Sequence, residues 1–345
     1  MHKSDKPLLI DNDPTASERK NDHINLALQS QVNHIDTRFY YEPLLSAHPS
    51  ISEWGAFTFL NRTLKNPLWV SSMTGGTGKA ATINNNLARA CGEFGMGMGL
   101  GSCRSLLYSD DTLADFNVRH LMGSDTPLYA NLGIGQLENL IETHKTHLIN
   151  ELVSKLQADG LIIHVNPLQE WLQPEGDRFK FSPLQTIETI LEKTKLKIIV
   201  KEVGQGFGYE SLKALYQLDI EAVDFAAAGG TNFAKLELLR GTELNQHVFS
   251  PFANVGHTAL EMVDMSNTIF KELGNKVRCN QVIISGGIQN FLDGYYLTSK
   301  INTNAVYGQA SGFLKHAMGT YDELRQYVFA QIQGLVMAKA MLNVK

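Results

Sequence analysis

The stretch GLIIHVNPLQEWLQPEGDRF, residues 160–179, decides the fold. Leu161, Ile162 and Ile163 form the short, unbroken apolar run that a strand buried on both faces requires. The run ends at His164, and several side chains that can donate, accept or ligate follow it closely. This pattern predicts a buried strand with functional groups at its carboxyl end. The alternative is an ordinary polar connection, since most loops are polar.

The same rhythm recurs along the chain from residue 68 onward. Short apolar runs alternate with polar or Gly-rich breaks and with segments of helical spacing, such as Ile83, Leu87 and Cys91. The eight apolar runs are residues 68–73, 95–102, 128–133, 161–166, 197–203, 222–229, 281–287 and 305–310. Eight alternating units predict right-handed βαβ connections and a closed (β/α)8 barrel, a TIM barrel. A doubly wound open sheet is less favoured, because no GxGxxG motif follows the first run.

Composition limits the class of protein and its partners. The 345 residues, 43% of them hydrophobic, can bury a large core, and a net charge of -5 gives no general attraction to nucleic acid or to an anionic membrane surface. Three cysteines without CxxC spacing, together with an N-terminus that lacks a long apolar segment, predict a cytoplasmic protein. No run reaches about 18 consecutive apolar residues, so we expect no membrane-spanning helix.

The expected organisation is a single barrel domain over residues 1–345. Residues 1–16 are expected to form a mobile lead-in, and residues 17–67 an N-terminal extension that contributes to the active site. The connection 232–276, between the sixth and seventh strands, is about twice as long as its neighbours. An insertion of this length predicts a lid, an added helix pair or an oligomer contact, and the sequence leaves these three open.

The N-terminal extension begins with a predicted helical arm over residues 17–30, with Ser17 as a candidate N-cap. Arg19, Lys20 and His23 cluster within about one turn of this helix. Charge clusters usually face water. The sharper interpretation is that the arm brings two cations and an imidazole onto an anionic ligand.

Polar and Gly-rich motifs follow the predicted strands, and in a (β/α)8 barrel the functional groups lie at those carboxyl ends. Glycines after the last two strands predict a phosphate site, because backbone N–H groups must approach the anion closely. A second, cationic anion site is expected from Arg19, Lys20, Arg104 and His164. Two anion sites together predict a phosphorylated cofactor that faces a phosphorylated substrate.

Three side chains carry the predicted chemistry. Lys201 follows three apolar residues on its strand, so its burial requires an anionic partner, either a flavin N1–C2=O edge or an acid such as Glu202. Glu170 is a candidate Mg²⁺ ligand, with a solvated acid paired with Arg178 as the alternative. Gln169 cannot titrate, so its expected role is to orient a substrate or cofactor through hydrogen bonds.

Eight motifs, taken together and in this order, resemble type 2 isopentenyl diphosphate isomerase, the FMN-dependent class. The motifs are RKNDH (19–23), SSMTGG (71–76), GSCR (101–104), ANLG (130–133), HVNPLQEWLQPEGDRF (164–179), KEVGQG (201–206), AAAGGTNF (226–233) and SGGI (285–288). The resemblance implies a (β/α)8 barrel that interconverts isopentenyl and dimethylallyl diphosphate. It also implies reduced FMN, Mg²⁺, NADPH as reductant, and a homo-oligomer, either a tetramer or an octamer.

The resemblance assigns site residues one by one. Gln169 and Lys201 are the implied catalytic residues, and Glu170 is the implied metal ligand. The substrate site that it implies comprises Arg19, Lys20, His23, Arg104, His164, Asn166 and Gln169. The cofactor site that it implies comprises Met73, Thr74, Gly75, Ser102, Asn131, Lys201, Thr231, Gly286, Gly287, Gln309 and Ala310.

Four residues depart from the family pattern. Cys103 stands where Gln is common, Gly208 where Ser is usual, Phe233 where Trp is frequent, and Asn304 where Gly usually precedes the last strand. No activating base lies beside Cys103 in the sequence, so we expect a packing cysteine rather than a nucleophile. These departures concern local packing and phosphate geometry more than the chemistry.

Two other functions compete with the isomerase. An FMN-dependent 2-hydroxy acid oxidase needs a His base and an Arg clamp near the end of the sixth strand, where this chain has Ala226–Gly229. A non-catalytic barrel that binds a prenyl diphosphate or FMN would not need Gln169, Glu170 and Lys201 together. The isomerase is therefore the favoured prediction.

Overall fold

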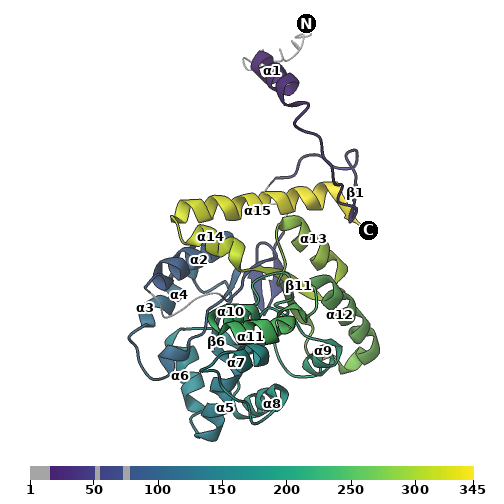
Figure 1. Cartoon of the computed structure of the whole chain (residues 1–345). Coiled ribbons are helices and arrows are strands. Elements are labelled where there is room, and N and C mark those ends of the chain that lie inside the picture. The colour runs from purple at the N-terminus through teal and green to yellow at the C-terminus, as the bar shows by residue number, and fades with distance from the viewer. Residues whose placement is uncertain (1–15, 51–54, 73–77) are drawn as a thin grey trace. The chain divides into compact units, whose positions relative to one another are not determined.

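Eight parallel strands, one from each apolar run, close into a barrel with helices around it (Figure 1). The computed structural model describes residues 16–50, 55–72 and 78–345. The predicted (β/α)8 barrel is confirmed, with the strand order β10-β11-β4-β5-β6-β7-β8-β9. The strands are β4 (Leu68–Val70), β5 (Gly97–Gly99), β6 (Leu128–Gly133), β7 (Gly160–Val165), β8 (Ile198–Glu202), β9 (Ala222–Asp224), β10 (Gln281–Ser285) and β11 (Asn304–Gln309).

The helices present their apolar faces to the barrel. On α2, the predicted stripe of Ile83, Leu87 and Cys91 is buried. The helices that follow strands are α2 (Ala80–Phe94), η2 (Arg104–Leu107), α3 (Leu113–Phe116), α4 (Arg119–Met122), α5 (Ile134–Glu142), α6 (His147–Lys155), α7 (Pro167–Leu172), α8 (Pro183–Lys193), α9 (Tyr209–Tyr216), α12 (Ala259–Leu273), η4 (Gly274–Lys276), α13 (Phe291–Lys300), α14 (Ser311–Ala317) and α15 (Tyr321–Met341). None of the helices in the described ranges is both long and apolar enough to cross a membrane.

The end of the barrel opposite the predicted site is closed by a hairpin that the sequence did not indicate. Its strands are β2 (Phe57–Phe59) and β3 (Arg62–Leu64). Phe59 packs in one buried cluster with Trp69 of β4 and Ile162 of β7. This part of the expected extension therefore supports the barrel floor.

The polar stretch after β7 forms a short helix, α7, rather than the loop expected from its composition. Pro167 occupies the first turn, where a missing N–H costs nothing and its fixed φ favours helix. The helix carries Gln169 and Glu170 next to the carboxyl end of the barrel.

The long connection after β9 contains an added helix pair, one of the three interpretations that the sequence left open. The pair is α10 (Phe233–Arg240) and α11 (Glu243–Phe249), followed by the 3-10 turn η3 (Ser250–Asn254). Side-chain caps fix both starts: Asn232 accepts from the N–H of Lys235, and Thr242 accepts from that of Asn245. Helix α10 packs against α7 through a small apolar cluster.

The described residues 16–40 form a separate N-terminal unit together with Lys345, while the described residues between 41 and 344 form the barrel unit. The predicted N-terminal helix is present as α1 (Ala16–Leu26) and ends before residue 30. Ser17, the expected N-cap, is the second residue of this helix. The short strands β1 (Phe39–Tyr41) and β12 (Leu342–Val344) complete the elements.

Candidate functional site

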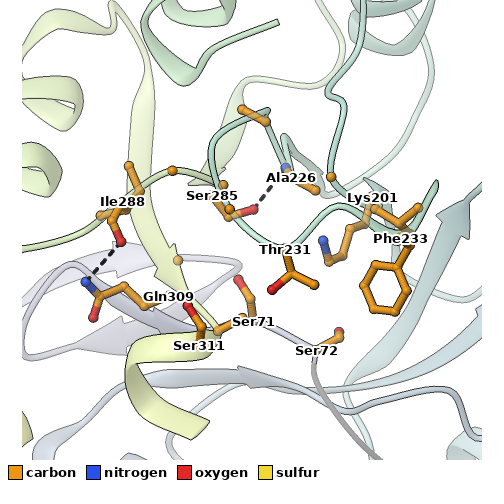
Figure 2. A pocket seen from close by; sticks show the side chains of 18 of the residues that line it. Ser71, Ser72, Lys201, Ala226, Thr231, Phe233, Ser285, Ile288, Gln309 and Ser311 are labelled. Atoms are coloured by element: carbon orange, nitrogen blue, oxygen red, sulfur yellow. Dashed lines mark hydrogen bonds between the residues drawn. The ribbon is translucent and has the colours of Figure 1, made fainter. Parts of the chain in front are cut away.

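A cavity of about 490 Å³ opens at the carboxyl ends of the barrel strands, where the sequence placed the functional groups. All eight strands contribute to its lining, either with residues near their carboxyl ends or with the residues that follow them. Figure 2 shows the side chains that point into it, among them Ser71, Lys201, Thr231 and Gln309. A pocket of this size, with a few converging polar groups, is typical of a small-molecule or cofactor site.

The structure brings many of the predicted site residues together around this cavity. Those that line it are Ser102, Asn131, His164, Gln169, Lys201, Thr231, Gly286, Gly287, Gln309 and Ala310. Gln169 and Lys201, which the sequence assigned to the chemistry, therefore share one cavity. Had they pointed to different sides of the molecule, the predicted chemistry would have been excluded.

Other predicted residues lie elsewhere. Arg19, Lys20 and His23 belong to α1 in the N-terminal unit, and their substrate role stays a prediction. Arg104 is exposed on the first turn of η2. The predicted cofactor residues Met73, Thr74 and Gly75 fall outside the described residues. Asn166 and Glu170 are buried directly behind Gln169.

Lys201 lies at the end of β8 and is only 8% exposed. Its Nζ donates to the backbone carbonyl of Glu202 at 2.8 Å and lies 3.9 Å from Oδ2 of Asp224. The carboxylate of Glu202 turns away and accepts the backbone N–H groups of Gly204, Gln205 and Gly206. The acid that pairs with Lys201 is therefore Asp224 and not Glu202.

Asp224 is fully buried at the end of β9. It accepts a short hydrogen bond from the hydroxyl of Ser285, and Ser285 Oγ accepts the N–H of Ala226 at 2.9 Å (Figure 2). Burial raises the pKa of Asp224, and the positive charge of Lys201 opposes this shift. This acid also helps to hold Ala226, whose φ of 42° is unusual for a residue with a side chain.

His164 is neutral at pH 7. Burial, assisted by the nearby charge of Lys201, lowers the pKa of its imidazole to about 4. Asn131 donates its Nδ2 hydrogen to Leu100 O, so its Oδ1 is free to accept from His164 Nδ1 at 2.7 Å. The proton therefore lies on Nδ1. His164 therefore adds no positive charge of its own to the anion site that the sequence predicts, and it offers the cavity the acceptor Nε2. Its place in the substrate site stays a prediction.

Gln169 is held in one orientation by partners on two helices. Its Nε2 donates to Oε1 of Glu237 on α10 at 3.2 Å, and its Oε1 accepts from Nδ2 of Asn166 at 3.1 Å. Glu237 is 2% exposed and also accepts from Arg240 at 2.6 Å. The added helix pair thus positions a side chain of the cavity.

Glu170 is buried and is not the solvated acid that the sequence left as an alternative. Its carboxylate accepts from Nδ2 of Asn166 at 2.9 Å and from the N–H of Asp177 at 2.7 Å, whereas Arg178 donates to its backbone carbonyl. The Oδ1 of Asn166 is buried without a hydrogen-bond partner among the described residues. Those residues contain no group of three His, Cys, Asp or Glu side chains that could cage a metal.

Comparison with known proteins decides the family. No protein-family model matches the chain. The isopentenyl-diphosphate delta-isomerases of Rickettsia peacockii and Rickettsia prowazekii are each 34% identical to it, over 92% of this chain and 90% of theirs. The isomerase of Rickettsia africae is 35% identical over 87% of this chain and 86% of its own length.

The chain belongs to the isopentenyl-diphosphate delta-isomerase family. Solved structures with a similar fold were also found. A mandelate oxidase variant with a monooxide FMN adduct matches 89% of this chain and 88% of its own, with a TM-score of 0.53 at 14% identity. A flavocytochrome b2 variant with benzoylformate matches 89% of this chain and 76% of its own, with a TM-score of 0.60 at 13% identity. At such identities the likeness extends to the barrel fold alone.

Several cavity groups in this member of the isopentenyl-diphosphate delta-isomerase family are unpartnered hydroxyls or closely packed glycines. The hydroxyl oxygens of Ser71 and Ser72 are buried and have no hydrogen-bond partner among the described residues. Gly286 has a φ of 87°, and a Cβ there would lie 2.1 Å from the Ala227 carbonyl. A Cβ on Gly308 would lie 2.4 Å from Ser71 Oγ. A side chain at either glycine would therefore collide with its neighbours, and both positions line the cavity.

The departures from the isopentenyl-diphosphate delta-isomerase pattern are accommodated locally. Burial raises the pKa of Cys103 to about 12, which confirms a packing thiol rather than a nucleophile. Gly208 starts α9 without a side-chain cap. Asn304 donates to Thr58 O at 2.7 Å and so ties β11 to the floor hairpin, and Phe233 lines the cavity.

Sequence reasoning assigned no role to Ser71, Ser72 and Ser285 of this family member, although they lie in motifs that it singled out, and it missed Asp224 and Glu237. Asp224 carries a weak signal, since it is the only acid in the apolar run AVDFAAAG. Glu237 is one of several charged residues in its helix, and only the packing of α10 on α7 shows which one is buried.

Proposed function

We propose that the chain interconverts isopentenyl and dimethylallyl diphosphate as a type 2, FMN-dependent enzyme. The observation that supports this most is the shared cavity of Gln169 and Lys201, next to the glycines at the ends of β10 and β11. The membership of the isopentenyl-diphosphate delta-isomerase family supports the reaction class. The FMN dependence and the division of roles below are the parts that we propose.

The described residues fit a flavin mononucleotide. Gly286, Gly287 and Gln309 would hold its phosphate. The two glycines have positive φ, a conformation that can turn successive backbone N–H groups toward an anion, and the side-chain amide of Gln309 lines the same cavity. The unpartnered hydroxyls of Ser71 and Ser72 would bond the ribityl chain or ring. When bound and reduced, the flavin supplies the acid and base that an alkene isomerisation needs.

Lys201 would stabilise negative charge on the ring edge. Its ammonium is nearly buried, so an anionic group beside it interacts more strongly than in water. The nitrogen reaches into the cavity between Thr231 and Phe233 (Figure 2). Val203, Phe233 and Ile288 are apolar residues of the lining and would exclude water from the isoprene carbons.

Gln169 would orient the isoprene unit, because Glu237 and Asn166 leave its amide no second orientation. Glu170 would provide the carboxylate for Mg²⁺, which commonly takes one or two carboxylates and completes its shell with phosphate oxygens and water. The unpartnered Oδ1 of Asn166 adds an oxygen that suits a cation or a metal-bound water. We further propose that Arg19, Lys20, His23 and Arg104 neutralise the diphosphate.

Turnover in D₂O under anaerobic conditions tests this proposal. Purified protein is supplied with FMN, NADPH, Mg²⁺ and isopentenyl diphosphate, and deuterium incorporation and dimethylallyl diphosphate are measured. We expect a yellow protein and turnover only after flavin reduction. Turnover that is equally fast without flavin would overturn the FMN dependence, and no turnover by flavin-loaded, reduced protein would overturn the activity.

A 2-hydroxy acid oxidase is the second candidate, because solved structures with the same barrel include mandelate oxidase and flavocytochrome b2. The cavity disfavours it. Among the described lining residues the one histidine is His164 on β7, and none is an arginine. Oxygen consumption with lactate, glycolate or mandelate would favour the oxidase.

The last part of the proposal concerns the assembly, the location and the reductant of the protein. We propose a cytoplasmic homo-oligomer, either a tetramer or an octamer, with NADPH as the reductant. Light scattering with size-exclusion chromatography measures the assembly. A monomer at micromolar concentration would contradict it.

A further inference from the structure

Asp224 is a fully buried acid that the proposed chemistry leaves without a role. Its register partner on the neighbouring strand β8 is Lys201. One carboxylate oxygen, Oδ1, accepts the hydroxyl hydrogen of Ser285. The other, Oδ2, has no hydrogen-bond partner among the described residues and lies 3.9 Å from Lys201 Nζ.

Charge, rather than a hydrogen bond, connects Asp224 to Lys201. A separation of 3.9 Å is too long for a hydrogen bond and short for an attraction between opposite charges. A buried carboxylate is costly without a counter-charge, and Lys201 provides the ion pair that the structure shows for Asp224. Removing either partner therefore changes the electrostatics of the other.

The Lys201 ammonium has hydrogen-bonding capacity left for a ligand. An ammonium carries three N–H donors. Within the described part of the chain, Nζ makes one hydrogen bond, to Glu202 O at 2.8 Å. The nitrogen thus lies close to one carbonyl and one carboxylate. Figure 2 shows the Lys201 side chain pointing into the cavity, where the nitrogen can still donate.

We propose that Asp224 is a positioning residue of the cofactor site, an inference that rests on the proposed FMN-dependent function. Its carboxylate, fixed by Ser285, holds Lys201 Nζ at the cavity wall and offsets its charge. A reduced flavin gathers negative charge at its N1–C2=O edge, whereas an oxidised one does not. Asp224 therefore limits how strongly Lys201 favours the reduced cofactor over the oxidised one.

FMN affinity in two redox states tests this role without measuring catalysis. Apo-protein is titrated with oxidised FMN in air and with reduced FMN under anaerobic conditions. Asp224→Asn keeps the shape and the hydrogen bond from Ser285 but removes the negative charge. The preference for reduced over oxidised FMN should rise by about tenfold, the order expected for one charge several ångströms away in a partly buried site.

Lys201→Met, with and without Asp224→Asn, shows whether the effect of Asp224 requires the lysine. Without the ammonium, a carboxyl buried this deeply is neutral, so adding Asp224→Asn should then change the redox preference by less than about twofold. Neither Lys201→Met nor the double variant leaves an unpaired buried charge. These two proteins can therefore be compared even where Asp224→Asn alone does not fold. Thermal unfolding of each variant reports the fold.

The outcomes separate the two proposals. An unchanged redox preference in folded Asp224→Asn would overturn the positioning role alone. A large change on adding Asp224→Asn to Lys201→Met would also overturn it, since Asp224 would then act without the lysine. Wild-type protein that binds neither form of FMN would overturn the proposed function and this inference with it.

Discussion

The amide nitrogen of Gln169 lies 3.2 Å from Oε1 of Glu237, so a helix of the insertion fixes a side chain at the end of β7. Glu237 is itself held by Arg240, and Asn166 holds the other end of the amide. The four residues come from α7, its N-cap and α10. The insertion therefore belongs functionally to the barrel rim.

The first prediction concerns Glu237. Replacing it with Gln removes a charged acceptor, and an amide there can turn its own donor toward Gln169. Loss of a hydrogen bond to a charged group costs about 1.5–3 kcal/mol, so we expect turnover to fall by roughly ten- to a hundredfold. FMN affinity should stay within about threefold of wild type, because Glu237 does not line the cavity. Single-turnover kinetics and FMN titration measure the two effects.

Glu188→Gln is the matched control for this variant, since Glu188 is an exposed acid on the outer helix α8. It should leave both turnover and FMN affinity unchanged. Equal losses of turnover and FMN affinity in Glu237→Gln would show that Glu237 supports the fold and not the orientation of Gln169.

The second prediction concerns the metal. Glu170→Gln keeps the size of the side chain and can keep its contact with Asn166, but it loses the hydrogen bond from Asp177 N–H and is a weaker ligand for a hard cation. We expect the Mg²⁺ concentration at half-maximal activity to rise by about tenfold or more, because this side chain is the carboxylate that we place at the metal. Manganese binding followed by electron paramagnetic resonance gives a reading independent of turnover. An unchanged metal titration would remove Glu170 from the ligands.

The barrel could be predicted because its evidence is local. Each apolar run, such as Leu161–Ile163, needs burial on both faces, and repeated alternation with helical segments leaves few topologies. The residues at the strand ends then converge as a consequence of the fold, which is why the sequence could assign Gln169 and Lys201, which line one cavity, to the same site.

The missed features depend on contacts between distant segments. The partner of Lys201 is Asp224 and not its neighbour Glu202, because successive side chains of a strand point to opposite faces. His164 is neutral because of its burial, and burial is not visible in the motif. The buried position of Glu237 is set by the packing of α10 on α7.

The third prediction concerns the glycine at the end of β10. Gly286→Ala places a Cβ 2.1 Å from the Ala227 carbonyl in a backbone with φ of 87°, so the loop must shift. We expect FMN affinity to fall by more than about tenfold, because the displaced N–H groups are those proposed to hold its phosphate. The affinity of the variant for riboflavin, which lacks the phosphate, should fall much less.

Gly123→Ala is the control for backbone strain. Gly123 has a similar φ of 76°, but a Cβ there would meet nothing within 4 Å. It should lower stability by about 1 kcal/mol and leave FMN affinity unchanged. A comparable loss of FMN affinity in both variants would show that backbone strain, and not the shape of the phosphate loop, causes the loss in Gly286→Ala.

The fourth prediction follows from the neutral state of His164. Its pKa is lowered from about 6.5 to about 4 in the folded protein, so between these values the unfolded chain binds the extra proton. The stability that this difference contributes is therefore complete above pH 6.5 and is lost as the pH falls toward 4. We expect wild-type protein to lose up to about 3 kcal/mol more than His164→Asn over this window. Urea unfolding of both proteins at several pH values measures it, and parallel pH profiles would show that folding leaves the pKa of the imidazole unchanged.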